Sequence, residues 1–406
     1  MHTTRRNALN VLGAATALLG LPQLSFAASS ALQQTSERRL VFIFLRGGMD
    51  GLSAVPPHGD PQYAKRRQAL AIAPPGTAGG ALDLDGHFGL NPALVEMHKL
   101  YALRELAVLQ AVASPYRERS HFDAQNLLEN GTVKPFGREA GWLNVALGVH
   151  QRATAQKSTR TLGFALGQSI PLLLRGPAQV GSWSPSQLPV PDNDLLERLA
   201  GLYQSDGVLA QSFKAAREAQ TLMEGRDGQG AMAAGAQPVL ALAKAAGEIL
   251  AKADGPRVAS IDFGGWDTHI SQVGEYGPLT RNLRLLDRSM AALKTTLGPV
   301  WQHTAVVVVS EFGRAVAPNG SGGTDHGTGG AAFVAGGAVR GGRVIADWPG
   351  LAEPALYEGR DLRPTLDLRA VFKAALVAQL GIDELALHTT VFPDSPAVRP
   401  LEGLFA

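Results

Sequence analysis

The 406-residue sequence contains no cysteine. This absence excludes disulfides, iron–sulfur clusters held by cysteine, and catalysis by a thiol. It is typical of an oxidising compartment, where a free thiol is a liability. Any metal ion bound by this protein must therefore be held by histidine, aspartate or glutamate side chains.

Charge is also scarce, and neither sign dominates. Charged residues make up 18% of the chain, and the formal net charge is +2. Arg5 and Arg6 account for this excess, because residues 1–27 contain no acid and no lysine. The rest of the chain is close to neutral. No basic stripe and no acidic tail points to nucleic acid or to an anionic membrane.

Beyond the first 27 residues, the sequence has no apolar run long enough to cross a bilayer. At its start, Arg5 and Arg6 precede a moderately apolar, glycine-broken run that ends in "SFA". This layout predicts a twin-arginine export signal over 1–27, cleaved after Ala27. An uncleaved N-terminal anchor is the alternative. We expect a periplasmic or secreted protein with no stable membrane span after signal removal.

Apolar patterning predicts a single α/β domain over 28–406. Hydrophobic residues make up 45% of the chain, which is enough for a large core. Continuous apolar runs predict buried strands, and helical spacing predicts helices between them. The predicted strands are 39–46, 105–114, 159–167, 256–263, 303–310 and 329–339, and the predicted helices are 120–131, 194–223, 278–298 and 366–381.

This alternation predicts a doubly wound, mostly parallel sheet with helices on both faces. Stretches rich in Pro, Gly and Ser predict loop insertions near 73–92 and 176–237.

Acidic residues and histidines cluster where the predicted strands end. In an open α/β sheet, sites form outside the carboxyl ends of the strands, so we expect these side chains to converge on one edge. Carboxylates and imidazoles without thiols suit zinc, manganese, magnesium, calcium or iron. The candidate metal ligands are Asp50, His121, Asp262, Asp267, His269, Glu311, Asp325 and His326.

Several of these residues also have simpler interpretations. Asp50 is at a position typical of a turn or helix cap, and Ser120 of an N-cap. Glu311 is spaced to pair with Arg314. Asp262 is placed to accept hydrogen bonds from the glycine turn after its strand. Capping alone does not readily explain Asp, Glu or His at five strand ends.

Six motifs in this order resemble an exported bacterial family, domain-of-unknown-function family 1501 of the alkaline phosphatase superfamily. They are "RRNALN", "FLRGGMDGL", "SHFDAQNLLENG", "DFGGWDTH", "SEFGR" and "GGTDHGTGG". The resemblance runs over nearly the whole chain and implies an alkaline-phosphatase-like fold. The family has no generally established activity, so the resemblance suggests chemistry without naming a substrate.

The superfamily's plan is two metals beside a nucleophile at a helix N-terminus. By resemblance, Ser120 matches the nucleophile and Asp50 the acidic ligand after the first strand. Asp267 with His269 resembles the Asp and His of one metal, and His326 the late histidine that completes it.

Other positions match less well. Asp262 resembles an outer acidic ligand. Glu311 falls where the superfamily has an aspartate followed directly by a histidine, and Phe312 stands in place of that histidine. One metal centre is therefore depleted, uses His121 instead, or is absent.

These features predict a metal-dependent hydrolase of phosphate or sulfate esters. One or two divalent ions (zinc, manganese, magnesium or calcium) would activate Ser120 or a water. Arg314 or Arg119 would neutralise charge that develops in the transition state. The expected partner is a small anionic ester or a co-exported protein. The alternatives are a non-catalytic or assembly protein that keeps the fold, and a metal enzyme that acts on a protein partner.

Overall fold

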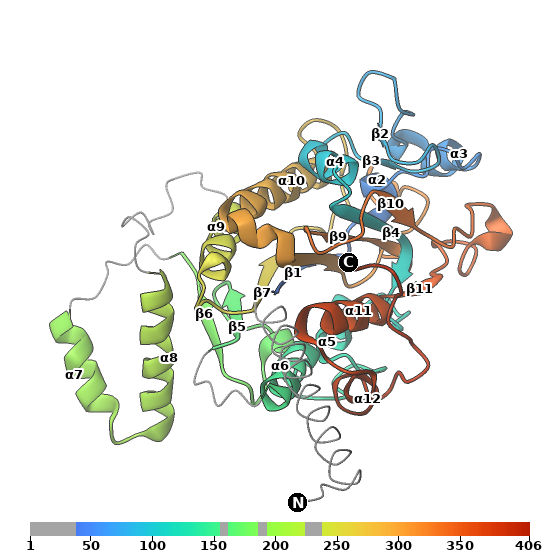
Figure 1. Ribbon diagram of the computed structural model, residues 1–406. Coiled ribbons are helices and arrows are strands. Elements are labelled where there is room, and N and C mark those ends of the chain that lie inside the picture. The colour runs from blue at the N-terminus through green and yellow to red at the C-terminus, as the bar shows by residue number, and fades with distance from the viewer. Residues whose placement is uncertain (1–37, 155–160, 186–192, 224–237) are drawn as a thin grey trace, which may run out of the picture. The chain divides into compact units, whose positions relative to one another are not determined.

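A computed structural model describes residues 38–154, 161–185, 193–223 and 238–406 (Figure 1). The predicted signal at 1–27 and part of the predicted insertion at 176–237 lie outside these ranges. Residues Arg39–Ala406 form one unit by their contacts.

A nine-stranded sheet is built around β1 (Arg39–Leu45), with the order β10-β4-β9-β8-β1-β7-β5-β6 and with β11 also paired to β4. The long apolar runs account for its central strands, because a strand covered on both faces needs apolar residues at every position. Each predicted strand is confirmed. The other strands are β4 (Leu106–Ala113), β5 (Gly163–Leu166), β6 (Val180–Trp183), β7 (Val258–Phe263), β8 (Thr304–Ser310), β9 (Gly330–Ala335), β10 (Arg343–Ile345) and β11 (Leu366–Asp367).

The direction of β9 differs from that of its neighbours. It pairs antiparallel with both β4 and β8, whereas the other pairs in this sheet are parallel. The amino end of β9 therefore lies at the edge where β1, β7 and β8 have their carboxyl ends. As a result, the glycine-rich loop that precedes β9 reaches the same edge as the loops that follow the other strands.

Both faces of the sheet are buried under helices (Figure 1). In β1, Val41 and Ile43 pack into one core with α4 (Val95–Ala102), α9 (Pro238–Ala251) and α10 (Pro278–Leu297). Phe42 and Phe44 point to the other face, where the core includes side chains of α5 (His121–Asn130), α6 (Trp142–Ala153) and α11 (Leu368–Leu380). The predicted mostly parallel sheet with helices on both faces is confirmed.

The predicted insertions contain regular elements. Within 73–92, β2 (Leu82–Asp83) and β3 (Gly89–Leu90) form an antiparallel pair. Within 176–237, the described residues form α7 (Asn193–Tyr203) and α8 (Gly207–Met223) after β6. The remaining short helices are α2 (Gly51–Ala54), α3 (Tyr63–Arg67), α12 (Glu384–Ala386), η1 (Gln68–Leu70), η2 (Leu172–Leu174), η3 (Gly298–His303), η4 (Glu353–Ala355) and the π-helical η5 (Leu387–Val391).

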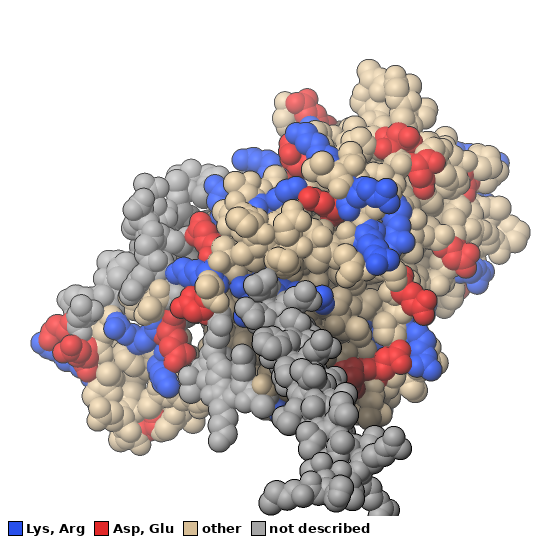
Figure 2. Space-filling view, in the orientation of Figure 1, with Lys and Arg blue, Asp and Glu red and all other residues tan. Residues whose placement is uncertain are grey.

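Lysine and arginine lie interspersed with aspartate and glutamate on the face drawn in Figure 2. Among the helices of the described ranges, none combines the length and the apolarity that a membrane crossing requires.

Candidate metal centre

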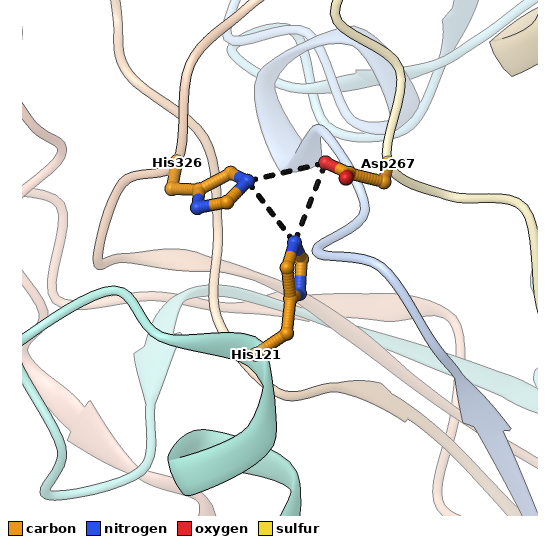
Figure 3. A group of neighbouring side chains, drawn as sticks. All are labelled: His121, Asp267 and His326. Atoms are coloured by element: carbon orange, nitrogen blue, oxygen red, sulfur yellow. Dashed lines mark hydrogen bonds and ion pairs between the residues drawn. The ribbon is translucent and has the colours of Figure 1, made fainter.

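The side chains of His121, Asp267 and His326 point toward one another at the carboxyl edge of the sheet (Figure 3). One potential ligand atom from each lies within 4.8 Å of the other two. His326 Nε2 is 3.0 Å from His121 Nε2 and 3.2 Å from Asp267 Oδ1. His121 begins α5, Asp267 follows β7, and His326 lies in the loop before β9. Three segments far apart in sequence therefore supply one group of potential ligands.

His269 joins this group from the loop that also carries Asp267. Its Nε2 atom lies 3.1 Å from His326 Nε2 and 2.9 Å from Asp267 Oδ1. Its Nδ1 atom lies 3.7 Å from Asp325 Oδ1, so Asp325 borders the group through His269. We call His121, Asp267, His269 and His326 the histidine cluster.

Hydrogen bonds assign the ring protons of two cluster histidines. His121 Nδ1 lies 2.8 Å from Glu311 Oε1, and His326 Nδ1 lies 3.0 Å from the Arg119 carbonyl oxygen. A carboxylate or carbonyl oxygen only accepts, so each neutral ring carries its proton on Nδ1. The two Nε2 lone pairs then face each other. This arrangement fits a divalent cation, because metal-bound histidines usually donate their other N–H to such oxygens.

The two rings respond differently to their surroundings. The hydrogen bond with Glu311 raises the pKa of His121, although burial opposes it. Burial lowers the pKa of His326, and His121 adds to that effect. When His121 carries a second proton, its Nε2–H can donate to His326 Nε2, which lies 3.0 Å away.

Glu311 is connected to the cluster by its hydrogen bond with His121. Its side chain is fully buried, and Oε1 accepts hydrogen bonds from His121 Nδ1, the Gly47 amide at 2.8 Å and Gln125 Nε2 at 2.9 Å. Burial alone would raise the pKa of Glu311, but the hydrogen bonds from His121 and Gln125 lower it overall. Glu311 was predicted as a metal ligand. The structure instead connects it to the cluster through His121.

An aromatic ring closes one side of the cluster. Phe312 is 5% exposed, and its ring centroid lies 4.7 Å from that of His121 and 5.2 Å from that of His326. This is the position where the superfamily resemblance expects a second-site histidine. Phe312 places an apolar ring there, while His121 belongs to the cluster.

Asp50 and Asp262 are not brought into the cluster. Asp50 is 1% exposed and caps α2, and its carboxylate is paired with Arg67. Burial alone would raise the pKa of Asp50, but Arg67 lowers it overall. Asp262 pairs with Arg46 at 3.0 Å. The capping interpretation of Asp50 matches the structure, and both predicted ligands have other partners.

Arg314 is buried and connects the loops around the histidine cluster. Its guanidinium donates to the carbonyl oxygens of Gly47, Trp266 and Thr324, and it pairs with Asp267 Oδ1 at 2.6 Å. Burial would raise the pKa of Asp267, but Arg314 lowers it overall, so the carboxylate stays ionised. Arg314 was predicted to stabilise a transition state. It is 1% exposed, and these contacts give it a positioning role beside the cluster.

Ser120 is the N-cap residue of α5, yet its side chain makes no capping hydrogen bond. Arg119 before it adopts a left-handed backbone with φ of 61°. Such strain persists where surrounding contacts enforce it. Here Asp361 and Glu358 hold the Arg119 guanidinium at 2.8 and 2.6 Å. The strained turn directs the Arg119 carbonyl to His326 and leaves the Ser120 hydroxyl free of a capping role.

Glycines let the loop "GSGGTDHGTGG" pack backbone against backbone. A Cβ atom at Gly323 would lie 2.2 Å from the carbonyl carbon of His269. One at Gly327 would lie 2.4 Å from that of Arg314. A side chain at either position would collide with backbone atoms and force the loop that carries His326, or its neighbour, to shift.

Three residues that were not predicted from the sequence contact the predicted site residues: Gln125, Gln272 and Arg67. Gln125 was detectable, because in "HFDAQ" it lies four residues after His121 on the same helix face. No motif marked Gln272 or Arg67.

The structure is distantly similar to solved structures. Ps i-CgsB in complex with k-i-k-neocarrahexaose has a TM-score of 0.41 and 9% identity, covering 86% of this chain and 73% of that chain. The phosphonate monoester hydrolase of Agrobacterium radiobacter has a TM-score of 0.34 and 11% identity, and the match covers 90% of this chain and 78% of that chain. The C-terminal periplasmic domain of EcEptC from Escherichia coli, in complex with Zn, has a TM-score of 0.31 and 10% identity. That match covers 73% of this chain and 72% of that chain.

No curated protein matches this chain. A family model described as "Protein of unknown function (DUF1501)" matches residues 108–390, which is more than half of the 406 residues. The matched range contains all four residues of the histidine cluster. The chain therefore belongs to the DUF1501 family.

Proposed function

We propose that this protein is an exported, metal-dependent hydrolase of phosphate or sulfate esters. The observation that carries the proposal is the convergence of three imidazole Nε2 atoms and one ionised carboxylate. Nitrogen and carboxylate donors in this number suit zinc first, and manganese or iron next. The cation would be held by His121, Asp267, His269 and His326. It would supply Lewis acidity, which polarises an ester oxygen and lowers the pKa of a hydroxyl or water.

The chain's own residues would prepare the reaction. Glu311 keeps the proton on His121 Nδ1, and the Arg119 carbonyl does the same for His326. The free N–H groups of the first turn of α5 favour an anion beside Ser120. The Ser120 oxygen would bond to phosphorus or sulfur as the bond to the leaving group breaks, and the proton lost by the Ser120 hydroxyl would balance the one that the departing oxygen takes up to leave as the alcohol. Water would then cleave the serine ester and restore the hydroxyl.

Phe312 favours a second candidate function. It replaces a ligand of the superfamily's two-metal plan with an apolar ring against His121 and His326. A protein that keeps one structural metal and assembles with a co-exported partner would have this feature. Such a protein would bind metal without turning over any ester.

Export is proposed from the sequence alone. Arg5 and Arg6 precede the apolar run, and the twin-arginine route carries folded proteins. Metal could then be loaded before the protein leaves the cytoplasm.

Metal analysis combined with a substrate screen tests the proposal. The full chain is assayed with zinc, manganese, magnesium or calcium against aryl phosphate monoesters, phosphodiesters and sulfate esters. We expect bound metal and turnover of one ester class. His326→Ala and Asp267→Ala should each lower metal content, melting temperature and turnover together, because a ligand that binds only the folded state stabilises it.

The matched control is His98→Ala, since His98 lies on α4 and bonds the Asp83 carbonyl. Bound metal without turnover of any ester would favour the assembly function. Wild-type protein that binds no divalent cation would contradict both candidates that use the cluster.

A further inference from the structure

Two loops carry three of the four cluster residues. Residues 266–270 follow β7 and carry Asp267 and His269, and residues 322–326 precede β9 and carry His326. The backbones of the two segments are bonded beside these loops, where the Ser271 and Gln272 amides donate to the Ser321 and Gly322 carbonyls at 2.9 and 3.0 Å. Nearer the ligands, the backbone bond is longer, because the Thr324 amide reaches the Thr268 carbonyl at 3.4 Å. Side chains that connect the two loops close to the ligands can therefore add to this backbone bonding in setting the relative position of the ligands.

Gln272 makes that connection from a fully buried position. Its Oε1 atom accepts hydrogen bonds from Thr324 Oγ1 at 2.9 Å and from Thr268 Oγ1 at 3.2 Å. Thr268 lies between Asp267 and His269, and Thr324 is two residues before His326. Both threonines are buried. A single amide oxygen thus holds one hydroxyl from each loop.

Asp50 fixes the orientation of this amide. Gln272 Nε2 donates to Asp50 Oδ2 at 2.5 Å. Because an ionised carboxylate only accepts, the amide must turn its nitrogen toward Asp50 and its oxygen toward the two threonines. A carboxylate at position 272 would place a second negative charge beside Asp50.

Arg67 connects the same group to a third loop. It pairs with Asp50 Oδ2, and its NH1 group donates to the Val316 carbonyl at 3.0 Å and the Ala315 carbonyl at 3.3 Å. Residues 315–316 directly follow Arg314, which pairs with the cluster residue Asp267. Asp50, Arg67 and Gln272 are all at most 1% exposed, so solvent does not compete for these bonds.

We infer that Gln272, Thr268, Thr324, Asp50 and Arg67 form a positioning clamp that sets the geometry of the histidine cluster. None of the five is a residue of the histidine cluster. The clamp holds the backbone on either side of the ligands, and Asp50 acts through it instead of as a ligand. This inference rests on the metal centre of the proposed function.

Removing the two hydroxyls without changing side-chain shape tests the clamp. Thr268→Val combined with Thr324→Val keeps the volume and leaves Gln272 Oε1 without donors. Loss of outer partners of metal ligands typically weakens metal binding about 10–100-fold, and we expect a loss in the lower part of that range. Zinc affinity is measured by competition with a chromophoric chelator. Absorption of the cobalt-loaded protein reports ligand geometry, and its ligand-field bands should shift.

Two variants separate positioning from general stability. Thr268→Ser with Thr324→Ser keeps both hydroxyls and should retain wild-type zinc affinity. Thr304→Val removes a buried hydroxyl that bonds the Val300 carbonyl at 2.8 Å, at the opposite end of β8. It should lower the melting temperature but leave zinc affinity and the cobalt spectrum unchanged. If the double valine variant does not fold, Thr324→Val alone should shift both readouts in the same direction.

Hydrogen exchange of the metal-free protein provides a test that does not need metal. The clamp predicts that amides of 266–270 and 322–326 exchange faster together after either hydroxyl is removed. Unchanged zinc affinity in a folded valine variant, or an equal loss in Thr304→Val, would overturn the inference while leaving the proposed function intact. If wild-type protein binds no cation, the proposed function fails and exchange decides the clamp: uncoupled exchange of the two loops would overturn it.

Discussion

Replacing Glu311 by glutamine tests the electrostatic design of the cluster with little change in shape. Glu311 Oε1 accepts three hydrogen bonds, and Oε2 lies 3.0 Å from Ser310 Oγ. In Glu311→Gln, the amide oxygen can keep the three donors while its nitrogen donates to Ser310 Oγ. The variant therefore removes the negative charge behind His121 and keeps the packing.

Loss of this charge should weaken metal binding. A carboxylate that accepts from a ligating histidine increases the basicity of that ligand, and its loss typically costs about 10–100-fold in affinity. This corresponds to about 1.4–2.7 kcal/mol at 1.36 kcal/mol per tenfold change. Calorimetric titration with zinc measures the change. The melting temperature of the metal-free protein should change little.

The matched control is Glu105→Gln. Glu105 is also largely buried, pairs with Lys294 and accepts from Trp301 Nε1 at 3.0 Å, at the opposite edge of the sheet. It should leave zinc affinity unchanged. Wild-type zinc affinity in a folded Glu311→Gln protein would refute the conclusion that this carboxylate prepares His121 as a ligand.

Three further predictions test other parts of the molecule. Ser120→Ala should abolish ester turnover while metal content and melting temperature stay near wild type, because the hydroxyl makes no cap hydrogen bond. Retained turnover would exclude Ser120 as the nucleophile. Arg5→Lys with Arg6→Lys should leave the protein in the cytoplasm, since paired arginines are the receptor-read address, and normal periplasmic yield in cell fractionation would remove the twin-arginine assignment. Burial lowers the pKa of Lys373 from 10.5 to about 8, so the unfolded chain binds more protons between these values and stability should rise with pH there. Urea unfolding should show a gain of at most about 1.4 kcal/mol per pH unit that Lys373→Met lacks, and equal slopes in both proteins would contradict this.

Apolar runs were sufficient to predict the central strands of the sheet, but not the short strands β6, β10 and β11. β1 and β8 are covered on both faces, so each contains a continuous apolar run, "LVFIFL" and "AVVVV", that is easily recognised. The antiparallel direction of β9 left no such signal, because "AAFVA" is equally compatible with either direction. Pairing partners are set by the whole fold, beyond what a short run of residues can specify.

The candidate site was only partly predictable. Residue type and strand-end position selected His121, Asp267 and His326, whose potential ligand atoms lie within 4.8 Å of one another. The same criteria also selected Asp50, which lies after a strand like the others but pairs with Arg67. Sequence position shows which edge of the sheet a carboxylate lies on. It does not show which cation, buried arginine or metal, neutralises it.

The separation of the cluster residues along the chain has a consequence for folding. His121 and His326 are 205 residues apart, and their Nε2 atoms meet only once β9 has paired with β8 and β4. Contacts this distant form slowly, because a long loop must close before they stabilise anything. A nascent chain therefore cannot complete the site until residue 326 has been synthesised and β9 has docked. Metal capture would be one of the last steps of folding, and tight zinc binding would report that the whole sheet has assembled.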